Sequence, residues 1–226
     1  MPAPETLVIT DYDRTLFDTG RFEQIVLQTL SRHYQLDEPT FRAEITERSI
    51  GASGYDLLAH LANYQIDAAD FTSVLDHELA GQDCLYSDTL PFLKYLTGRP
   101  DLAMRLVTVG APSYQQLKLR ALRRAHPHLP MHIIGINKGA WLAEQWAEAK
   151  LQPQPTSRLS FQGQSYRQAI VIDDRADSFR DIQQHPLVTG IHIVRPGSKY
   201  QDRQPSLATV ESLAQAVDVI EQLCVS

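Results

Sequence analysis

The sequence predicts an α/β fold: a parallel β-sheet flanked by helices, with an all-helical domain inserted after the first strand. Over most of the chain, short apolar runs of strand length alternate with segments of helical periodicity. This alternation favours parallel strands that are joined by crossover helices. Residues 18–88 are the exception, because their apolar residues recur at helical spacing alone. We therefore expect a core domain formed by residues 1–17 and 89–226 and a helical cap domain formed by residues 18–88.

The first strand is expected at Leu7–Thr10, where continuous apolar character is typical of a strand buried on both faces of a parallel sheet. After this strand, the apolar residues recur at helical spacing. Breaks at residues 37–40 and 51–54 and a helix start at Asp67 divide this segment into four expected helices. Residues 86–88 follow as the expected hinge by which the chain returns to the core.

The rest of the core is expected to alternate strands and helices. Each further strand is placed where apolar residues form a short run, and each helix where apolar residues return every three or four positions. A loop is expected at residues 152–156, which contain two prolines, and a small surface hairpin at residues 161–166. The expected strands are 104–109, 131–136, 169–172 and 191–194, and the expected helices are 90–96, 114–124, 140–150, 176–185 and 209–223.

Composition and charge argue against several classes of protein. The chain has 226 residues, 43% of them hydrophobic and 21% charged, which is ordinary for a globular domain. Its net charge is -6 and its basic residues are scattered, so we expect no nucleic-acid partner. Cys84 and Cys224 lie far apart without metal-binding spacing, which argues against structural zinc and a disulfide framework. No apolar run reaches membrane-spanning length and no secretory leader is recognisable after Met1, so the cytoplasm is the expected compartment.

Chemically active side chains accompany the ends of four expected strands. Acidic residues at the ends of buried strands are costly to desolvate, so a bound cation and a substrate would explain their position. Two carboxylates close together disfavour each other's ionisation unless a cation lies between them, and Mg²⁺ prefers oxygen ligands. The residues are Asp11 and Asp13 after the first strand, Thr108 in the second, Lys138 after the third, and Asp173 and Asp174 after the fourth.

Together these residue types can carry out phosphoryl transfer with Mg²⁺ as the cofactor. A carboxylate can attack phosphorus to form an aspartyl-phosphate, which divides hydrolysis into two easier steps, and Asp11 is the natural nucleophile. Asp13 could give a proton to the leaving oxygen and later take one from water. Thr108 and Lys138 supply the hydroxyl donor and the fixed cation that a reaction based on positioning and charge stabilisation still requires.

The four elements resemble the motifs of the haloacid dehalogenase superfamily. Asp11–Phe17, with the sequence DYDRTLF, matches its first motif, DxDxT followed by leucine and an aromatic residue. Thr108, Lys138 and Ile170–Asp174 match the second, third and fourth motifs. The resemblance covers nearly the whole core and implies a Rossmann-like parallel sheet. Residues 18–88 stand where this family inserts its first type of helical cap.

The resemblance also implies roles for individual residues. Asp11 is implied to be the nucleophile and a metal ligand, and Asp13 the acid/base, with its backbone carbonyl on Mg²⁺. Thr108 is implied to bind the phosphoryl oxygens, and Lys138 to neutralise charge on the nucleophile and the phosphate. The remaining candidates are Asp173 and Asp174 at the metal, with Asp174 orienting the site, and Thr15 and Gly110 at the substrate. Arg175, next to the acidic pair, could contact a substrate anion or could equally lie on the surface.

Three points stay open. Position 14 is an arginine where glycine is common in the family, so Arg14 could crowd the turn or contact a phosphate. The fourth motif usually has a further acid four residues after the metal ligand, and this acid is Asp177 only if the count starts at Asp173 instead of Asp174. Lys118 competes with the lysine after the third strand as the lysine of the site.

We therefore expect a Mg²⁺-dependent phosphatase that acts on a small phosphorylated metabolite, as a monomer or a homodimer. The family's dehalogenase branch lacks an acid at the position of Asp13, so this acid favours phosphate esters over carbon–halogen bonds. A phosphomutase that returns the phosphoryl group to its substrate is one alternative. A phosphate-binding or regulatory module without turnover is the other, because of Arg14. Neither nucleic acid nor a membrane is expected as a partner.

Overall fold

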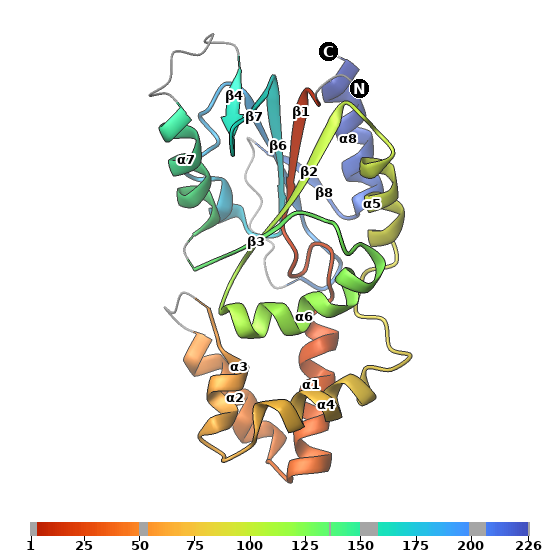
Figure 1. Cartoon of the computed structure of the whole chain (residues 1–226), viewed down its shortest axis with the longest axis vertical. Coiled ribbons are helices and arrows are strands. Elements are labelled where there is room, and N and C mark those ends of the chain that lie inside the picture. Colours follow the sequence, from red (N-terminus) through yellow and green to blue (C-terminus); the bar gives the residue numbers. More distant parts are fainter. Residues whose placement is uncertain (1–3, 50–53, 136, 150–157, 199–206, 226) are drawn as a thin grey trace.

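The structure is a computed structural model that describes residues 4–49, 54–135, 137–149, 158–198 and 207–225. Within these residues, six strands form one parallel sheet in the order β3-β2-β1-β6-β7-β8 (Figure 1). The first strand therefore lies inside the sheet, with the carboxyl ends of its two neighbours beside its own. The strands are β1 (Thr6–Thr10), β2 (Leu102–Val109), β3 (Met131–Ile134), β6 (Gln168–Asp173), β7 (Val188–Ile193) and β8 (Ala208–Val210).

Both faces of the sheet are covered, which explains the continuous apolar runs of its inner strands. In β1, Val8 packs into one hydrophobic cluster while Leu7 and Ile9 pack into the other, and all three side chains are fully buried. Figure 1 shows the layers on the two sides. The helices α5 (Thr89–Thr97), α6 (Pro112–Ala125) and α8 (Leu213–Val225) contribute to the first cluster, and α7 (Lys138–Ala149) with the hairpin β4 (Leu159–Phe161) and β5 (Gln164–Tyr166) contributes to the second.

The segment between β1 and α5 forms a group of helices beyond the carboxyl ends of the strands, on the far side of α6 (Figure 1). Three of its helices begin at an aspartate that accepts hydrogen bonds from their first backbone amides: Asp18, Asp56 and Asp67. No helix in the described part of the chain is long and apolar enough to cross a membrane. The helices are α1 (Thr19–Tyr34), α2 (Glu38–Ser49), α3 (Leu57–Ala62) and α4 (Ala68–Glu78).

The inserted helices contact the core at the beginning of α6. The Ser113 hydroxyl donates a hydrogen bond of 2.8 Å to Oδ2 of Asp56. Gly54 and Gly110 meet backbone to backbone, because a Cβ placed on Gly54 would lie 2.4 Å from the Cα of Gly110. Gly54 also has a φ of +132°, a conformation that side chains rarely adopt, so glycine is required here for two reasons.

The parallel α/β fold class is confirmed, and so is the hairpin, although its buried Phe161 and Tyr166 show that it packs on the core instead of lying on the surface. The helix expected at 176–185 is wrong. A 3₁₀ helix, η1 (Ala176–Phe179), and turns replace it, with hydrogen bonds mostly between residues three apart. The strand β8 was not expected. The residues 51–53 and 152–156, expected to form breaks or loops, lie outside the described residues.

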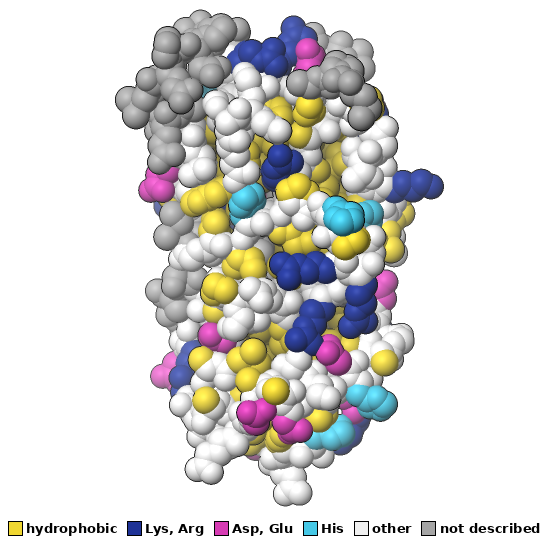
Figure 2. Space-filling view, in the orientation of Figure 1, with side chains coloured by type: hydrophobic (Ala, Val, Ile, Leu, Met, Phe, Trp, Pro, Cys, Tyr) yellow, Lys and Arg dark blue, Asp and Glu magenta, His cyan; other side chains and the backbone are white. Residues whose placement is uncertain are grey.

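The surface carries no single basic stripe on the face shown in Figure 2. There the Lys and Arg side chains are separated by hydrophobic, acidic and other polar groups. Several cations of the described residues are paired with acids, for example Arg120 with Asp76 at 2.6 Å and Arg32 with Glu78 at 2.7 Å. This mixed distribution agrees with the scattered basic residues of the sequence.

Candidate active site

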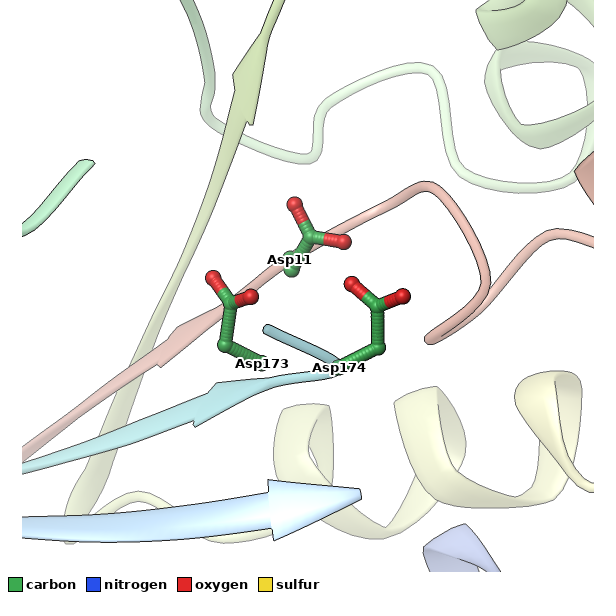
Figure 3. A group of neighbouring side chains, drawn as sticks. All are labelled: Asp11, Asp173 and Asp174. Carbon is green, nitrogen blue, oxygen red and sulfur yellow. The ribbon is translucent and has the colours of Figure 1, made fainter. Parts of the chain in front are cut away.

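Three aspartates meet where β1 and β6 end side by side in the sheet. Asp11 follows β1 directly, Asp173 is the last residue of β6, and Asp174 comes next. One carboxylate oxygen from each lies within 4.8 Å of the other two. Figure 3 shows the three carboxyl groups turned toward a common space. We call Asp11, Asp173 and Asp174 the aspartate trio.

Lys138 supplies a positive charge to the trio. It is the first residue of α7 and is 2% exposed. Its Nζ donates hydrogen bonds to Oδ1 of Asp11 at 2.6 Å and to Oδ2 of Asp173 at 2.5 Å. The backbone amide of Arg175 donates to the other oxygen of Asp173 at 2.9 Å. One lysine is therefore shared between two buried carboxylates.

The trio holds more negative charge than its surroundings balance. Burial, strengthened by repulsion among the acids, raises the pKa of Asp11 to about 7 and that of Asp174 to about 9. Oδ2 of Asp11 and Oδ2 of Asp174 are buried and have no hydrogen-bond partner among the described residues. With all three acids ionised, the carboxylates and the one ammonium would sum to two negative charges, and the raised pKa values reflect the cost of that state without a further cation. A divalent cation that prefers oxygen ligands, such as Mg²⁺, fits this donor set in both charge and chemistry.

The carboxylate of Asp13 lies in a separate group of donors. Lys118 Nζ is 2.6 Å from each of its oxygens, and the side chains of Thr19 and Gln115 donate to it at 2.7 and 2.8 Å. Burial alone would raise the pKa of Asp13, but the ammonium of Lys118 and these hydrogen bonds hold it below its ordinary value. The two lysines weighed from the sequence thus have different acids as partners, since Lys138 contacts the trio.

Residues 11–17 form the tight turn that joins β1 to the inserted helices. The amide of Arg14 donates to the carbonyl of Phe17 at 2.7 Å, and the amide of Leu16 donates to the carbonyl of Tyr12 at 2.9 Å. Arg14 has a φ of +61°, which is unusual for a residue with a side chain. Its positive charge opposes the rise in the pKa of Asp174.

The candidate substrate-binding residues differ in their surroundings. Thr108 in β2 and Thr15 in the turn are fully buried, and each hydroxyl lacks a hydrogen-bond partner within the described residues. Gly110 has a φ of +152°, and a Cβ there would lie 2.6 Å from Nε2 of Gln115. The exposed guanidinium of Arg175 pairs with both oxygens of Asp177, at 3.0 and 2.8 Å. Asp177 is thus engaged with Arg175 and is not a member of the trio.

Several residues that support the site were not identified from the sequence. Arg195 donates to the carbonyl of Thr15 at 2.7 Å and forms a two-point pair with Asp88. A ring nitrogen of His192 lies 3.0 Å from the carbonyl oxygen of Asp174. No periodicity marks these residues. Gln115 did carry a signal, because it stands three positions before Lys118 and so shares a helix face with it.

No family model matches the sequence, and no curated protein matches it well enough to count as a relative. Solved structures do match. A haloacid dehalogenase-like hydrolase from Burkholderia xenovorans LB400 superposes with a TM-score of 0.64 and 14% identity, over 97% of this chain and 98% of that chain. The HAD-hydrolase YfnB from Bacillus subtilis, solved with bound magnesium, gives a TM-score of 0.56 and 14% identity, over 97% and 99% of the two chains.

A third similar structure is a 2-haloacid dehalogenase from Pseudomonas syringae pv. Tomato DC3000. Its TM-score is 0.53 and its identity 17%, over 97% of this chain and 99% of that chain. Identities this low establish the fold and not the reaction. The chain has the fold of the haloacid dehalogenase-like hydrolases, which confirms at the level of the fold the resemblance carried by the four sequence motifs.

Proposed function

We propose that this protein is a Mg²⁺-dependent phosphatase of the haloacid dehalogenase superfamily that hydrolyses a small phosphorylated metabolite through an aspartyl-phosphate at Asp11. The observation that carries the proposal is the aspartate trio with Lys138, because ionising all three buried acids beside this one lysine would leave two negative charges unbalanced by it. A structural cluster of acids would be expected to carry enough local cations to neutralise it. A divalent ion and an anionic substrate would account for the imbalance.

In the first step of the proposed reaction, a carboxylate oxygen of Asp11 attacks phosphorus while the bond to the leaving oxygen breaks. Lys138 fixes the orientation of the Asp11 carboxylate through Oδ1 and offsets part of its charge. Asp13 is the expected donor of the proton to the leaving oxygen; because its lowered pKa leaves it ionised at neutral pH, it must first take up that proton from solvent. When bound to the trio, Mg²⁺ would neutralise charge on the transferring phosphoryl group.

In the second step, water attacks phosphorus and releases phosphate from Asp11. Asp13 takes the proton from this water, and its lowered pKa means that it is ionised and ready for this role at neutral pH. The buried hydroxyl of Thr108 is the expected donor to the phosphoryl oxygens, since it lies next to the last residue of β2, a strand beside β1, and lacks another partner among the described residues. Asp11 is then regenerated.

The proposal is tested by measuring phosphate release from 4-nitrophenyl phosphate with and without MgCl₂. We expect activity that requires Mg²⁺ and that disappears in Asp11→Asn, because an amide is a poor nucleophile. Asp218→Asn, which changes an exposed aspartate of α8, is the matched control and should keep full activity. Activity that persists in Asp11→Asn would contradict the assignment of the nucleophile.

A panel of phosphorylated sugars, nucleotides and amino-acid precursors then identifies the substrate, and a 2-haloacid serves as the test of the competing chemistry. The presence of Asp13 leads us to expect phosphate release and no halide release. Halide release from the 2-haloacid, with no phosphate released from any ester, would contradict the proposed phosphatase.

A further inference from the structure

We propose that Lys118 is a positioning residue that fixes the carboxylate of Asp13, the acid/base of the proposed reaction. This inference rests on the proposed function for the role of Asp13. The first observation is burial. Lys118 is 4% exposed, and because lysine is rarely buried without a paired acid, a partner is expected for its ammonium. Its Nζ lies 2.6 Å from both oxygens of Asp13, so the two groups form a buried two-point ion pair.

The second observation is that Lys118 is joined to the turn after β1 at two places. Besides the ion pair, its backbone carbonyl accepts a hydrogen bond of 2.8 Å from the hydroxyl of Tyr12, which is fully buried. Tyr12 and Asp13 are adjacent in the sequence, and they point to the carbonyl and the ammonium of the same lysine. The bond to the carbonyl places position 118 beside the turn whatever its side chain, and the ammonium of Lys118 then reaches the carboxylate of Asp13.

The third observation is that the carboxylate of Asp13 has a full set of donors. A carboxylate offers about four acceptor positions. Lys118 occupies one on each oxygen, Thr19 donates to Oδ1, and Gln115 donates to Oδ2. Thr19 opens α1 of the insert, whereas the two other donors belong to α6. The orientation of the carboxylate is therefore defined from both sides of the turn, and one of these donors must give way when Asp13 exchanges a proton.

Lys138 cannot replace Lys118 in this role. Its ammonium is already bonded to Asp11 and Asp173, and those acids carry an excess of negative charge. Without Lys118, Asp13 would be an uncompensated carboxylate whose charge repels Asp11. Each lysine thus serves one part of the site, Lys138 the aspartate trio and Lys118 the acid/base.

The first test asks whether the pair exists in the folded protein, and it does not depend on activity. Thermal unfolding is measured for the wild type, Asp13→Asn, Lys118→Met and the double variant. We expect Lys118→Met to lower Tm by several degrees and the double variant to recover part of this loss, because asparagine leaves no unpaired charge. Losses of Tm that simply add would overturn the pairing. If Lys118→Met does not fold, Lys118→Gln, which keeps a hydrogen-bond donor, replaces it in the cycle.

The second test asks whether the pair matters for turnover. With 4-nitrophenyl phosphate, Lys118→Met should lower kcat about 100-fold, the usual scale of acid–base catalysis, and change KM less than about threefold. In the Asp13→Asn background the same substitution should lower kcat no further. Lys94→Met, at an exposed position of α5, is the control and should match the wild type. An additive loss in kcat, or a gain of turnover in Lys118→Met, would overturn the positioning role.

The two tests separate this inference from the proposed function. A wild-type protein that releases phosphate from no ester would contradict the phosphatase, and the catalytic part of this inference with it. The thermal cycle would still decide whether Lys118 and Asp13 form the pair. Conversely, an active enzyme whose kcat falls additively in the double variant would leave the phosphatase standing and reject Lys118 as a positioning residue.

Discussion

Lys118 and Lys138 look alike in the sequence, since each lies in or at the start of a helix that follows a strand of the core. Their contacts in the folded chain are different: Lys138 touches two members of the trio, and Lys118 touches only Asp13 among the acids of the site. The strand-end acids could be identified from the sequence because each follows an apolar run. The partner of a helical lysine could not, because it depends on how α6 packs against the turn.

The loss of Lys138 should destabilise the protein. In Lys138→Met, Asp11 and Asp173 lose their shared cation while both remain buried. Breaking a buried ion pair by removing one partner typically costs about 3–5 kcal/mol. We expect a decrease of this order in the free energy of unfolding, measured with urea in the absence of divalent ions. An unchanged midpoint in urea, matching that of Lys94→Met, would contradict the contacts of Lys138.

Asp88 and Arg195 predict a dependence of stability on pH. Burial alone would raise the pKa of Asp88, but hydrogen bonds and charge from Arg195, with the amide of Leu213, hold it below its ordinary value of 3.8. Because the pKa is lower in the folded than in the unfolded protein, the stabilisation is present above pH 3.8 and is lost as the pH falls through the folded value.

We therefore expect Asp88→Asn to be less stable than the wild type at pH 7, by about 1–3 kcal/mol, the range for hydrogen bonds to charged groups. The difference should shrink at an acidic pH below the folded pKa of Asp88, where the wild-type carboxyl is protonated. Urea unfolding at both pH values measures it, with Asp218→Asn as the control for loss of an exposed carboxylate. A difference that is equally large at both pH values would show that the charge of Asp88 is not its source.

At the scale of elements, the contact between the inserted helices and the beginning of α6 depends on two glycines, Gly54 and Gly110. Gly54→Ala would place a Cβ 2.4 Å from the Cα of Gly110, and its φ of +132° is itself unfavourable. A residue held in such a conformation costs of the order of 1–3 kcal/mol, and here the backbone must also move. We expect a loss of stability of at least this size in thermal or urea unfolding. Gly135→Ala, where nothing lies within 4 Å of the added carbon, should have little effect and is the control.

The strands and helices could be predicted where their apolar residues form a continuous run or recur at helical spacing. The strands β1, β2, β3, β6 and β7 coincide with apolar runs, and the inserted helices with apolar residues at helical spacing. Residues 176–185 contain apolar positions at similar spacing but fold as a 3₁₀ helix and turns, in which most of the bonded amides reach back three residues. The strand β8 has three residues and lies at the sheet edge, too short to form a recognisable run.

For the whole molecule, the parallel order of the strands is what brings residues 11, 138 and 173–174 to one place. This meeting of distant residues could be predicted from the sequence motifs, because the carboxyl ends of parallel strands share one edge of the sheet. The supporting contacts from Arg195, His192 and Thr19 come from distant segments and follow from the packing of the entire chain. They could be found only in the folded structure.

Binding of Mg²⁺ should stabilise the whole molecule, because the ion would replace the missing positive charge at the trio. A ligand that binds only the folded state adds about 2.7 kcal/mol at a concentration 100 times its Kd. We expect Tm to rise with MgCl₂ and to return to its starting value with EDTA. Asp173→Asn should weaken this response, whereas Asp218→Asn should keep it. A Tm that does not change with MgCl₂ would contradict an ion site at the trio.

Helix α7 carries the tryptophans of the chain, whose fluorescence can be measured directly. Both tryptophans of the chain, Trp141 and Trp146, lie on this helix, which begins at Lys138. Trp141 packs near the rings of His132 and Phe161, and Trp146 is 4% exposed. The inserted helices contain no tryptophan. Tryptophan emission, excited selectively, therefore reports on the side of the sheet that holds Lys138, and rearrangements confined to the inserted helices should leave it unchanged.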